Sequence, residues 1–205
     1  MRYIELLDRL KGFTVFSLND IRSSGGRFHR RRLNEWQEKG YIKKIAKGYY
    51  IFSDLKLDEG ALFEIANRIY SPSYISFEAA LSYYGMIPEA VYGVTSASTR
   101  KTYSLKAPIA EFSYRTISTG LFFGYDLIKH GDKHFRIASP EKAVLDYCYI
   151  NKTIKEDSGY ASLRIDKEAF FKKVSVRILN VYLRKIGQKA LAKRVKALLE
   201  FIKHA

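Results

Sequence analysis

The side chains best suited to chemistry in this sequence are the arginines, lysines and asparagine of residues 23–52. The stretch reads SSGGRFHRRRLNEWQEKGYIKKIAKGYYIF, an arginine-rich segment followed by a lysine-rich one. In the major groove of DNA, arginine pairs through two hydrogen bonds with guanine, and asparagine does so with adenine. Lysines beside them would bind phosphates and raise the affinity for any sequence. The stretch therefore predicts a DNA-binding surface.

A helix over residues 27–39 would sort these side chains onto two faces. With about 100° per residue, Phe28, Leu33 and Trp36 share the face that must pack on a core. Arg32 lies on that side, and we expect its guanidinium to reach a phosphate or a nearby carboxylate. The opposite face carries the side chains predicted to contact bases, which are Arg27, Arg30, Arg31 and Asn34.

The neighbouring residues predict the elements that would hold this helix in place. Apolar spacing predicts a helix at residues 2–10, and Ser17 is a suitable N-cap for a second helix through residue 21. Two β-rich runs, at residues 41–45 and 49–52, predict a hairpin. Three helices and a basic hairpin are the layout of a winged helix-turn-helix, which we assign to residues 1–54. The hairpin would carry the phosphate-binding lysines Lys43, Lys44 and Lys47.

A solvated surface is the alternative explanation for this basic face, because runs of charge often lie on solvated helix faces. The charge is concentrated at the two ends of the chain. Residues 1–54 hold 12 Lys/Arg against 6 Asp/Glu, residues 55–150 hold 10 against 10, and residues 151–205 hold 14 against 5. Because both the predicted helix and the hairpin after it are basic, we favour nucleic-acid binding over a solvated face.

The remaining residues predict a second domain at residues 60–205, after a short acidic linker. Two helices are expected near residues 59–70 and 76–84, the second with Ser76 as its N-cap, and Ser139-Pro140-Glu141 is a typical helix start. Short aromatic and β-branched runs predict four or five antiparallel strands within residues 91–138, and helices are expected from residue 166 onward. The predicted fold class is therefore α+β: a winged helix-turn-helix, then a mixed domain with a small antiparallel sheet and C-terminal helices.

Other candidate sites are weaker. His130 and His134 are four residues apart, but they flank a turn and have no obvious third metal ligand. Asp126 and Asp132 resemble a pair of catalytic acids only in composition, since no nucleophile lies nearby. The 16 tyrosines are expected to fill a core rather than stack on bases. No catalytic or phosphate-loop motif occurs, so we expect a protein that is not an enzyme and has no cofactor or metal.

The composition favours a folded cytoplasmic protein. Its 205 residues are 47% hydrophobic, which is ample for a core. The sequence contains no run of 18 apolar residues, so we expect no membrane span. The first residues, MRYIELLDRLKGF, have no clean apolar region of the kind a signal peptide needs. Cys148 is the only cysteine, so we expect a buried thiol in a reducing compartment.

The last residues form a second basic zone. Apolar spacing across residues 178–202 predicts an amphipathic helical hairpin that is broken near Gly187. Its Lys/Arg face is either a solvated surface or a second contact with a polyanion. We favour the polyanion, because the excess of cations exceeds what solubility requires.

The middle of the chain resembles a known family. The phrases YISFEAALSYYGMIPEAVYGVTSASTRK, FSYRTISTGLFFGY and FRIASPEKAVLDYCYI, taken in order, are similar to the AbiEi family of antitoxins from type IV toxin–antitoxin systems. The resemblance covers residues 13–150, includes the hairpin phrase KGYIKKIAKGYYIF, and is most distinctive at ASPEKAVLD. The last fifty-five residues match less clearly.

The resemblance implies a DNA-binding transcriptional autorepressor that also acts as an antitoxin in abortive infection, a form of phage defence. Such proteins repress their own operon through inverted repeats, beside a gene for a nucleotidyltransferase-like toxin. Residues 60–205 would then form the antitoxin domain, which opposes the toxin without a stable complex. Two alternatives stay open: an RNA-binding protein that uses the winged helix and the basic C-terminal helices, and a module that binds the toxin directly.

Overall fold

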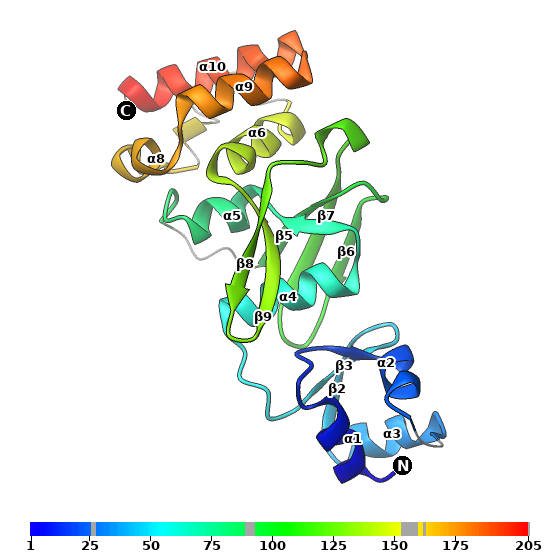
Figure 1. Ribbon diagram of the computed structural model, residues 1–205. Helices are drawn as coiled ribbons and strands as arrows, with labels where there is room; N and C mark the ends of the chain where they lie inside the picture. The colour runs from blue at the N-terminus through cyan, green and yellow to red at the C-terminus, as the bar shows by residue number, and fades with distance from the viewer. Residues whose placement is uncertain (26–27, 89–92, 153–159, 162, 205) are drawn as a thin grey trace.

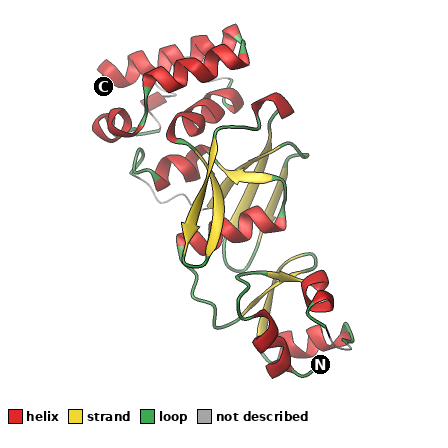
Figure 2. Ribbon diagram, in the orientation of Figure 1, coloured by secondary structure: helices red, strands yellow, loops and turns green. Residues whose placement is uncertain are grey.

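The computed structural model of the chain describes residues 1–25, 28–88, 93–152, 160–161 and 163–204. Figure 1 shows an elongated molecule with a small N-terminal unit at one end, a larger sheet in the middle and the C-terminal helices at the other end. Helices and strands are mixed along the chain (Figure 2), and the strands form one sheet of three strands and one of six. The fold is therefore of the α+β class, as predicted.

The N-terminal unit packs its helices on one face of a three-stranded antiparallel sheet with the order β1-β3-β2. Leu33 and Trp36 of the third helix are buried there with Phe16 and Tyr50 from the strands. Strand β1 has two residues and was not predicted from the sequence. The elements of this unit are α1 (Tyr3–Leu10), β1 (Phe16–Ser17), α2 (Leu18–Ser23), α3 (Arg31–Glu38), β2 (Ile42–Ala46) and β3 (Tyr49–Phe52).

The start of α2 is fixed by a reciprocal cap. The Asp20 amide donates to Ser17 Oγ at 3.3 Å, and the Ser17 amide donates to the Asp20 carboxylate at 2.6 Å. Two backbone donors that the first turn leaves unpaired are thereby satisfied. The predicted N-cap role of Ser17 is confirmed.

The second face of the small sheet is also buried. Tyr50 and Phe52 point into the core of the N-terminal unit, whereas Ile51 between them belongs to the core of the larger unit. Val15 and Ile45 join Ile51 there. Because side chains alternate along a strand, the hairpin separates the two cores and contributes to both.

The larger sheet has six strands in the order β6-β7-β5-β4-β9-β8 and is mixed. Strands β5 and β7 pair in parallel, as do β4 and β9, while the other neighbours are antiparallel. The prediction of a small antiparallel sheet confined to residues 91–138 is therefore wrong. Its strands are β4 (Ser73–Ile75), β5 (Gly93–Ser98), β6 (Tyr103–Lys106), β7 (Glu111–Thr116), β8 (Tyr125–His130) and β9 (Lys133–Ala138).

The omission of β4 from the predicted sheet has a physical origin. This strand is fully buried and only three residues long, so it shows no alternation of apolar and polar side chains that a sequence could reveal. It lies between helices α4 (Glu59–Ile69) and α5 (Phe77–Tyr83), and it joins β5 to β9 at the centre of the sheet. There it pairs antiparallel with β5 and parallel with β9.

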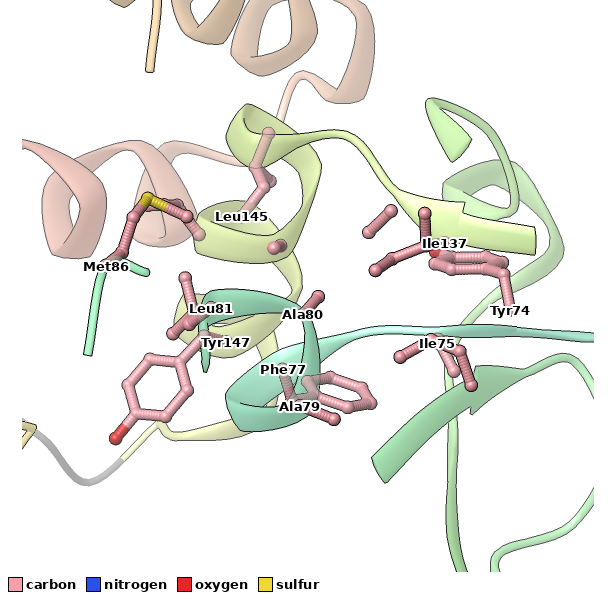
Figure 3. Close-up of a cluster of buried hydrophobic side chains, with 14 of the residues drawn as sticks. Tyr74, Ile75, Phe77, Ala79, Ala80, Leu81, Met86, Ile137, Leu145 and Tyr147 are labelled. Atoms are coloured by element: carbon pink, nitrogen blue, oxygen red, sulfur yellow. The ribbon is translucent and has the colours of Figure 1, made fainter. Parts of the chain in front are cut away.

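Helices pack on the larger sheet and on one another. Helix α4 packs on β4, β5 and β9, while α5 packs on β5 and on α6 (Pro140–Ile150). Figure 3 shows Leu81 of α5 and Leu145 of α6 in the buried cluster, with Met86 beside them. Helix α6 begins as predicted, with Ser139 accepting from the Lys142 amide at 3.3 Å and Pro140 in the first turn.

The chain ends in α8 (Lys167–Lys173), α9 (Val176–Ile186) and α10 (Lys189–His204). Helix α9 ends at Gly187, whose φ of 69° lies in the left-handed region that favours glycine. The predicted break near Gly187 is confirmed, and α9 and α10 both pack on α6. None of the described helices combines the length and the apolar character that crossing a membrane requires.

Candidate nucleic-acid interface

Helix α3 is shorter than the predicted helix of residues 27–39. It begins at Arg31. Its first turn is closed by the Leu33 amide, which donates to the Arg30 carbonyl at 3.1 Å. Arg30 occupies the N-cap position and makes no capping hydrogen bond with its side chain. Phe28 precedes the helix but still packs as expected, since its ring stacks on Trp36 with centroids 5.9 Å apart.

The buried and exposed faces of α3 follow the sequence pattern. Leu33 and Trp36 are 1% and 3% exposed. The predicted base-contacting residues Arg30, Arg31 and Asn34 are exposed on the outer side. Neither Arg30 nor Arg31 forms an ion pair with another described residue. Arg27, the fourth predicted member of this face, lies outside the described residues.

Arg32 behaves differently from its neighbours. Its guanidinium lies 3.0 Å from the Glu35 carboxylate, three residues further along α3. The expectation that Arg32 would reach a nearby carboxylate is therefore confirmed. This pair leaves Arg30 and Arg31 as the cations of α3 without a carboxylate partner in the described chain.

The three hairpin lysines are exposed, but strand register divides them. Lys44 lies opposite Tyr50, which belongs to the N-terminal core, whereas Lys43 lies opposite Ile51, which belongs to the larger core. Opposite residues in an antiparallel pair point to the same face. Lys44 is thus on the face of the hairpin that carries α3, and Lys43 is on the face toward the larger unit. Lys47 is at the turn.

The N-terminal unit contacts α4 of the larger unit through Phe13, Thr14 and Asp20. Asp20 accepts a hydrogen bond from the Arg68 guanidinium at 2.7 Å, and the same guanidinium lies 5.0 Å from the centre of the Phe13 ring. Burial opposes ionisation of Asp20, but its hydrogen bonds from Ser17 and Arg68 outweigh burial and hold the pKa of this carboxyl below its ordinary value. The Thr14 hydroxyl also donates to Glu64 of α4.

A buried polar cluster lies in the most distinctive phrase of the sequence, ASPEKAVLD. Lys142 and Asp146 of α6 are both fully buried and form an ion pair. Tyr74 and Ser76 donate to the second carboxylate oxygen of Asp146 at 2.9 and 2.8 Å, and Lys142 donates to the Tyr74 hydroxyl at 2.8 Å. Burial lowers the pKa of Lys142 and raises that of Asp146, while their contact opposes both shifts.

The structure separates the residues of the weaker candidate sites. His130 lies opposite Lys133, so the next residue, His134, points to the other face of the β8–β9 hairpin. His130 instead contacts Asp58 at 3.0 Å. Asp126 lies four residues before the end of β8, roughly 13 Å along the strand from the turn that holds Asp132. Among the described residues, no three metal-ligating side chains gather at one place.

Aromatic and thiol groups of the larger unit mostly fill its core, as expected. Tyr74 and Tyr114 are fully buried, and the Tyr114 hydroxyl donates to the Ala66 carbonyl at 2.9 Å. Cys148 is 3% exposed, and burial raises the pKa of its thiol to about 12 although Arg194 opposes the shift. A thiol with this pKa stays protonated and unreactive.

Comparison with solved structures reveals a likeness of fold. The fold is similar to the crystal structure of the RV2827C protein from Mycobacterium tuberculosis, with a TM-score of 0.59 over 96% of this chain and 76% of that one. The two sequences are 12% identical, so the likeness concerns the fold alone. No protein-family model matches the chain, and no curated protein does.

Proposed function

We propose that the N-terminal unit is a winged helix-turn-helix that binds duplex DNA. Helix α3 would lie in the major groove, and the β2–β3 hairpin would be the wing beside it. The observation that carries the proposal is the outer face of α3, where Arg30, Arg31 and Asn34 are exposed and free of carboxylates in the described chain. Lys44 adds a cation on the same face of the hairpin.

The order of elements supports this docking. Helix α2 and helix α3 are consecutive, and both bury apolar side chains in one small core. Leu33 and Trp36 fix the rotation of α3, so its arginines are presented outward on a rigid element. A helix held in this way can bring two or three side chains to base edges while neighbouring lysines contact the backbone.

The regulatory role rests on the resemblance to the AbiEi family. We infer a transcriptional autorepressor that binds inverted repeats in its own operon and is the antitoxin of a type IV system. The functional partner would be a nucleotidyltransferase-like toxin, and the larger unit would carry the antitoxin activity. The phrase ASPEKAVLD contributes Lys142 and Asp146 to a buried cluster in that unit. These two residues would therefore stabilise the fold of the antitoxin domain and would not contact a partner.

A footprint on the DNA upstream of the chain's own gene tests the proposal. The full chain should protect a discrete sequence, and Arg30→Ala or Arg31→Ala should each weaken binding to it by about 1–3 kcal/mol and relax sequence preference. Lys172→Ala, on an exposed residue of α8 at the end of the molecule opposite α3 (Figure 1), removes the same charge and should leave the affinity nearly unchanged. Normal operator binding by both arginine variants would overturn the assignment of α3.

A further inference from the structure

A second basic site is formed between the last two helices. A groove of about 640 Å³ lies between α9 and α10, and Arg177, Asn180 and Arg184 of α9 line it. Lys196 of α10 lines it as well, and Leu183 and Ala192 complete the lining. Three cations and an amide thus surround a small apolar floor.

Helical spacing explains why these side chains meet. Arg177, Asn180 and Arg184 are separated by three and four residues, so they lie along one face of α9. Leu179 and Leu183, on the neighbouring face, are buried and fix the rotation of the helix. The basic face therefore cannot turn inward without exposing the leucines.

The groove cations differ from Arg194 and Lys203 of α10. Arg194 donates to the Cys148 carbonyl at 2.8 Å, and Lys203 contacts Glu200 at 2.8 Å, so both have partners within the fold. Arg177, Arg184 and Lys196 pair with no carboxylate in the described part of the chain. Residues 167–204 hold 11 Lys/Arg against 2 Asp/Glu, so the surroundings supply little neutralising charge.

Like charges that converge on one groove repel one another unless an anion lies between them. A solvated surface would be better served by cations spread over the helices. Arginine is also the side chain whose planar group matches a phosphate through two parallel hydrogen bonds. The groove is therefore suited to phosphate groups rather than to carboxylates of its own chain.

The position of the groove separates it from α3. Figure 1 shows α9 and α10 at one end of the molecule and α3 at the opposite end, with the six-stranded sheet between them. A short operator duplex on α3 would not reach the groove. A ligand bound there is a different nucleic acid or a distant part of the same one.

We propose that the α9–α10 groove binds the phosphodiester backbone of a second nucleic-acid segment. Arg177 and Arg184 would hold phosphates from one wall, and Lys196 would hold them from the other. Asn180 would donate its amide to a phosphate or sugar oxygen, and Leu183 and Ala192 would accept the apolar side of a sugar. The segment is either RNA or duplex DNA remote from the operator, and the site exists independently of the proposed role of α3.

The test uses the full chain carrying Arg30→Ala and Arg31→Ala, so that binding at α3 is weakened. Fluorescence anisotropy measures the affinity for a labelled single-stranded RNA, a hairpin RNA and a duplex DNA of unrelated sequence. Arg177→Gln with Arg184→Gln should weaken binding of at least one probe by about ten-fold and lower its salt dependence. Lys172→Gln with Lys173→Gln removes the same charge from exposed residues of α8 and should change affinity by less than about two-fold.

Equal losses in the two double variants would mean that only diffuse charge attracts the probes, and the groove proposal would fail. No loss in the groove variant would also overturn it. A loss of affinity for RNA alone or for duplex DNA alone supports the groove proposal and identifies which nucleic acid supplies the backbone. If the glutamine pair lowers the melting temperature, Lys196→Gln replaces it, with an expected loss of about three-fold. Operator affinity of the chain with native α3 should be unchanged by the groove variant, so the two proposals fail separately.

Discussion

The charges at the two ends of the molecule and the charges in its middle behave in opposite ways. On α3 and on α9, arginines such as Arg31 and Arg184 are exposed and have no carboxylate partner in the described chain. In the middle, Lys142, Arg68 and Lys133 each contact an aspartate. Similar side chains therefore stabilise the fold in one region and remain free for a ligand in the others.

The comparison teaches that position decides what a charge does. Lys142 is fully buried and is paired with Asp146, because burial of a charge without a partner is prohibitive. The ends keep an excess of cations because their helices bury only apolar faces. A change in a buried charge should alter stability and leave binding unchanged, whereas a change at the ends should do the reverse.

The largest expected effect is at the buried cluster of α6. Asp146→Leu should lower the free energy of unfolding by about 3–5 kcal/mol, because it leaves the buried Lys142 ammonium without a carboxylate partner. Urea denaturation followed by circular dichroism measures the loss. At a temperature where the variant is folded, its operator affinity should equal that of the unmodified chain.

The double variant Lys142→Met with Asp146→Leu sharpens this result. Removing both charges leaves no unpaired ion, so the double variant should be more stable than Asp146→Leu alone. If the loss of stability in the double variant equalled the sum of the losses in Lys142→Met and Asp146→Leu, the two charges would not be coupled. Burial would then not explain why Lys142 needs its partner.

The next effect is at Asp20, which joins α2 to α4. Asp20→Asn should lower the free energy of unfolding by about 1–2 kcal/mol near neutral pH, because the cap of α2 and the Arg68 contact both lose a charged acceptor. The pKa of Asp20 is lower in the folded chain, so its contribution is present above the pKa of the unfolded state, about 4. It is lost as the pH falls through the folded pKa.

Thermal melts from pH 7 down to pH 2 measure this dependence. The difference between the unmodified chain and Asp20→Asn should shrink below about pH 4. A difference that stayed constant across that range would assign the effect to packing rather than to the charge. Lys106→Gln, which removes an exposed ion pair with Glu111 in the larger unit, serves as the control and should change stability very little.

A smaller effect distinguishes the two hairpin lysines. Lys44→Ala should weaken binding to every DNA sequence by about 1 kcal/mol and reduce the slope of log affinity against log salt by about one unit. Lys43→Ala should do less, because register places it on the face toward the larger unit. Salt titrations with operator and unrelated duplexes measure both. Equal effects of the two lysines would show that the hairpin is approached from its edge rather than from the α3 side.

Local signals in the sequence predicted the local structure well. The N-cap at Ser17, the helix start at Ser139-Pro140 and the break at Gly187 each depend on one side chain and its neighbours, and each is present. Ser76 is instructive, since it occupies the predicted N-cap of α5 but donates its hydroxyl to Asp146. The sequence thus located the N-cap position correctly, but the contact with Asp146 takes the Ser76 hydroxyl away from the helix backbone.

Features that depend on distant residues could not be read from the sequence. The parallel pairing of β4 with β9 joins segments about sixty residues apart, and β4 is too short to show alternation. The division of Lys43 from Lys44 depends on their partners across the hairpin. The basic zone of the last helices was visible, but the groove that selects Arg177 and Arg184 depends on the packing of α9 beside α10.

The smallest expected effect is at Arg32, and it tests the outer face of α3 most directly. Arg32 is adjacent to Arg31, yet it pairs with Glu35, with 45% of its side chain exposed. Such an exposed pair three residues apart contributes at most about 0.5 kcal/mol to stability. Arg32→Ala should therefore change both the free energy of unfolding and the operator affinity by less than about 0.5 kcal/mol. A loss of affinity as large as that of Arg31→Ala, measured for the two variants in parallel gel-shift titrations, would mean that α3 approaches DNA along a different face.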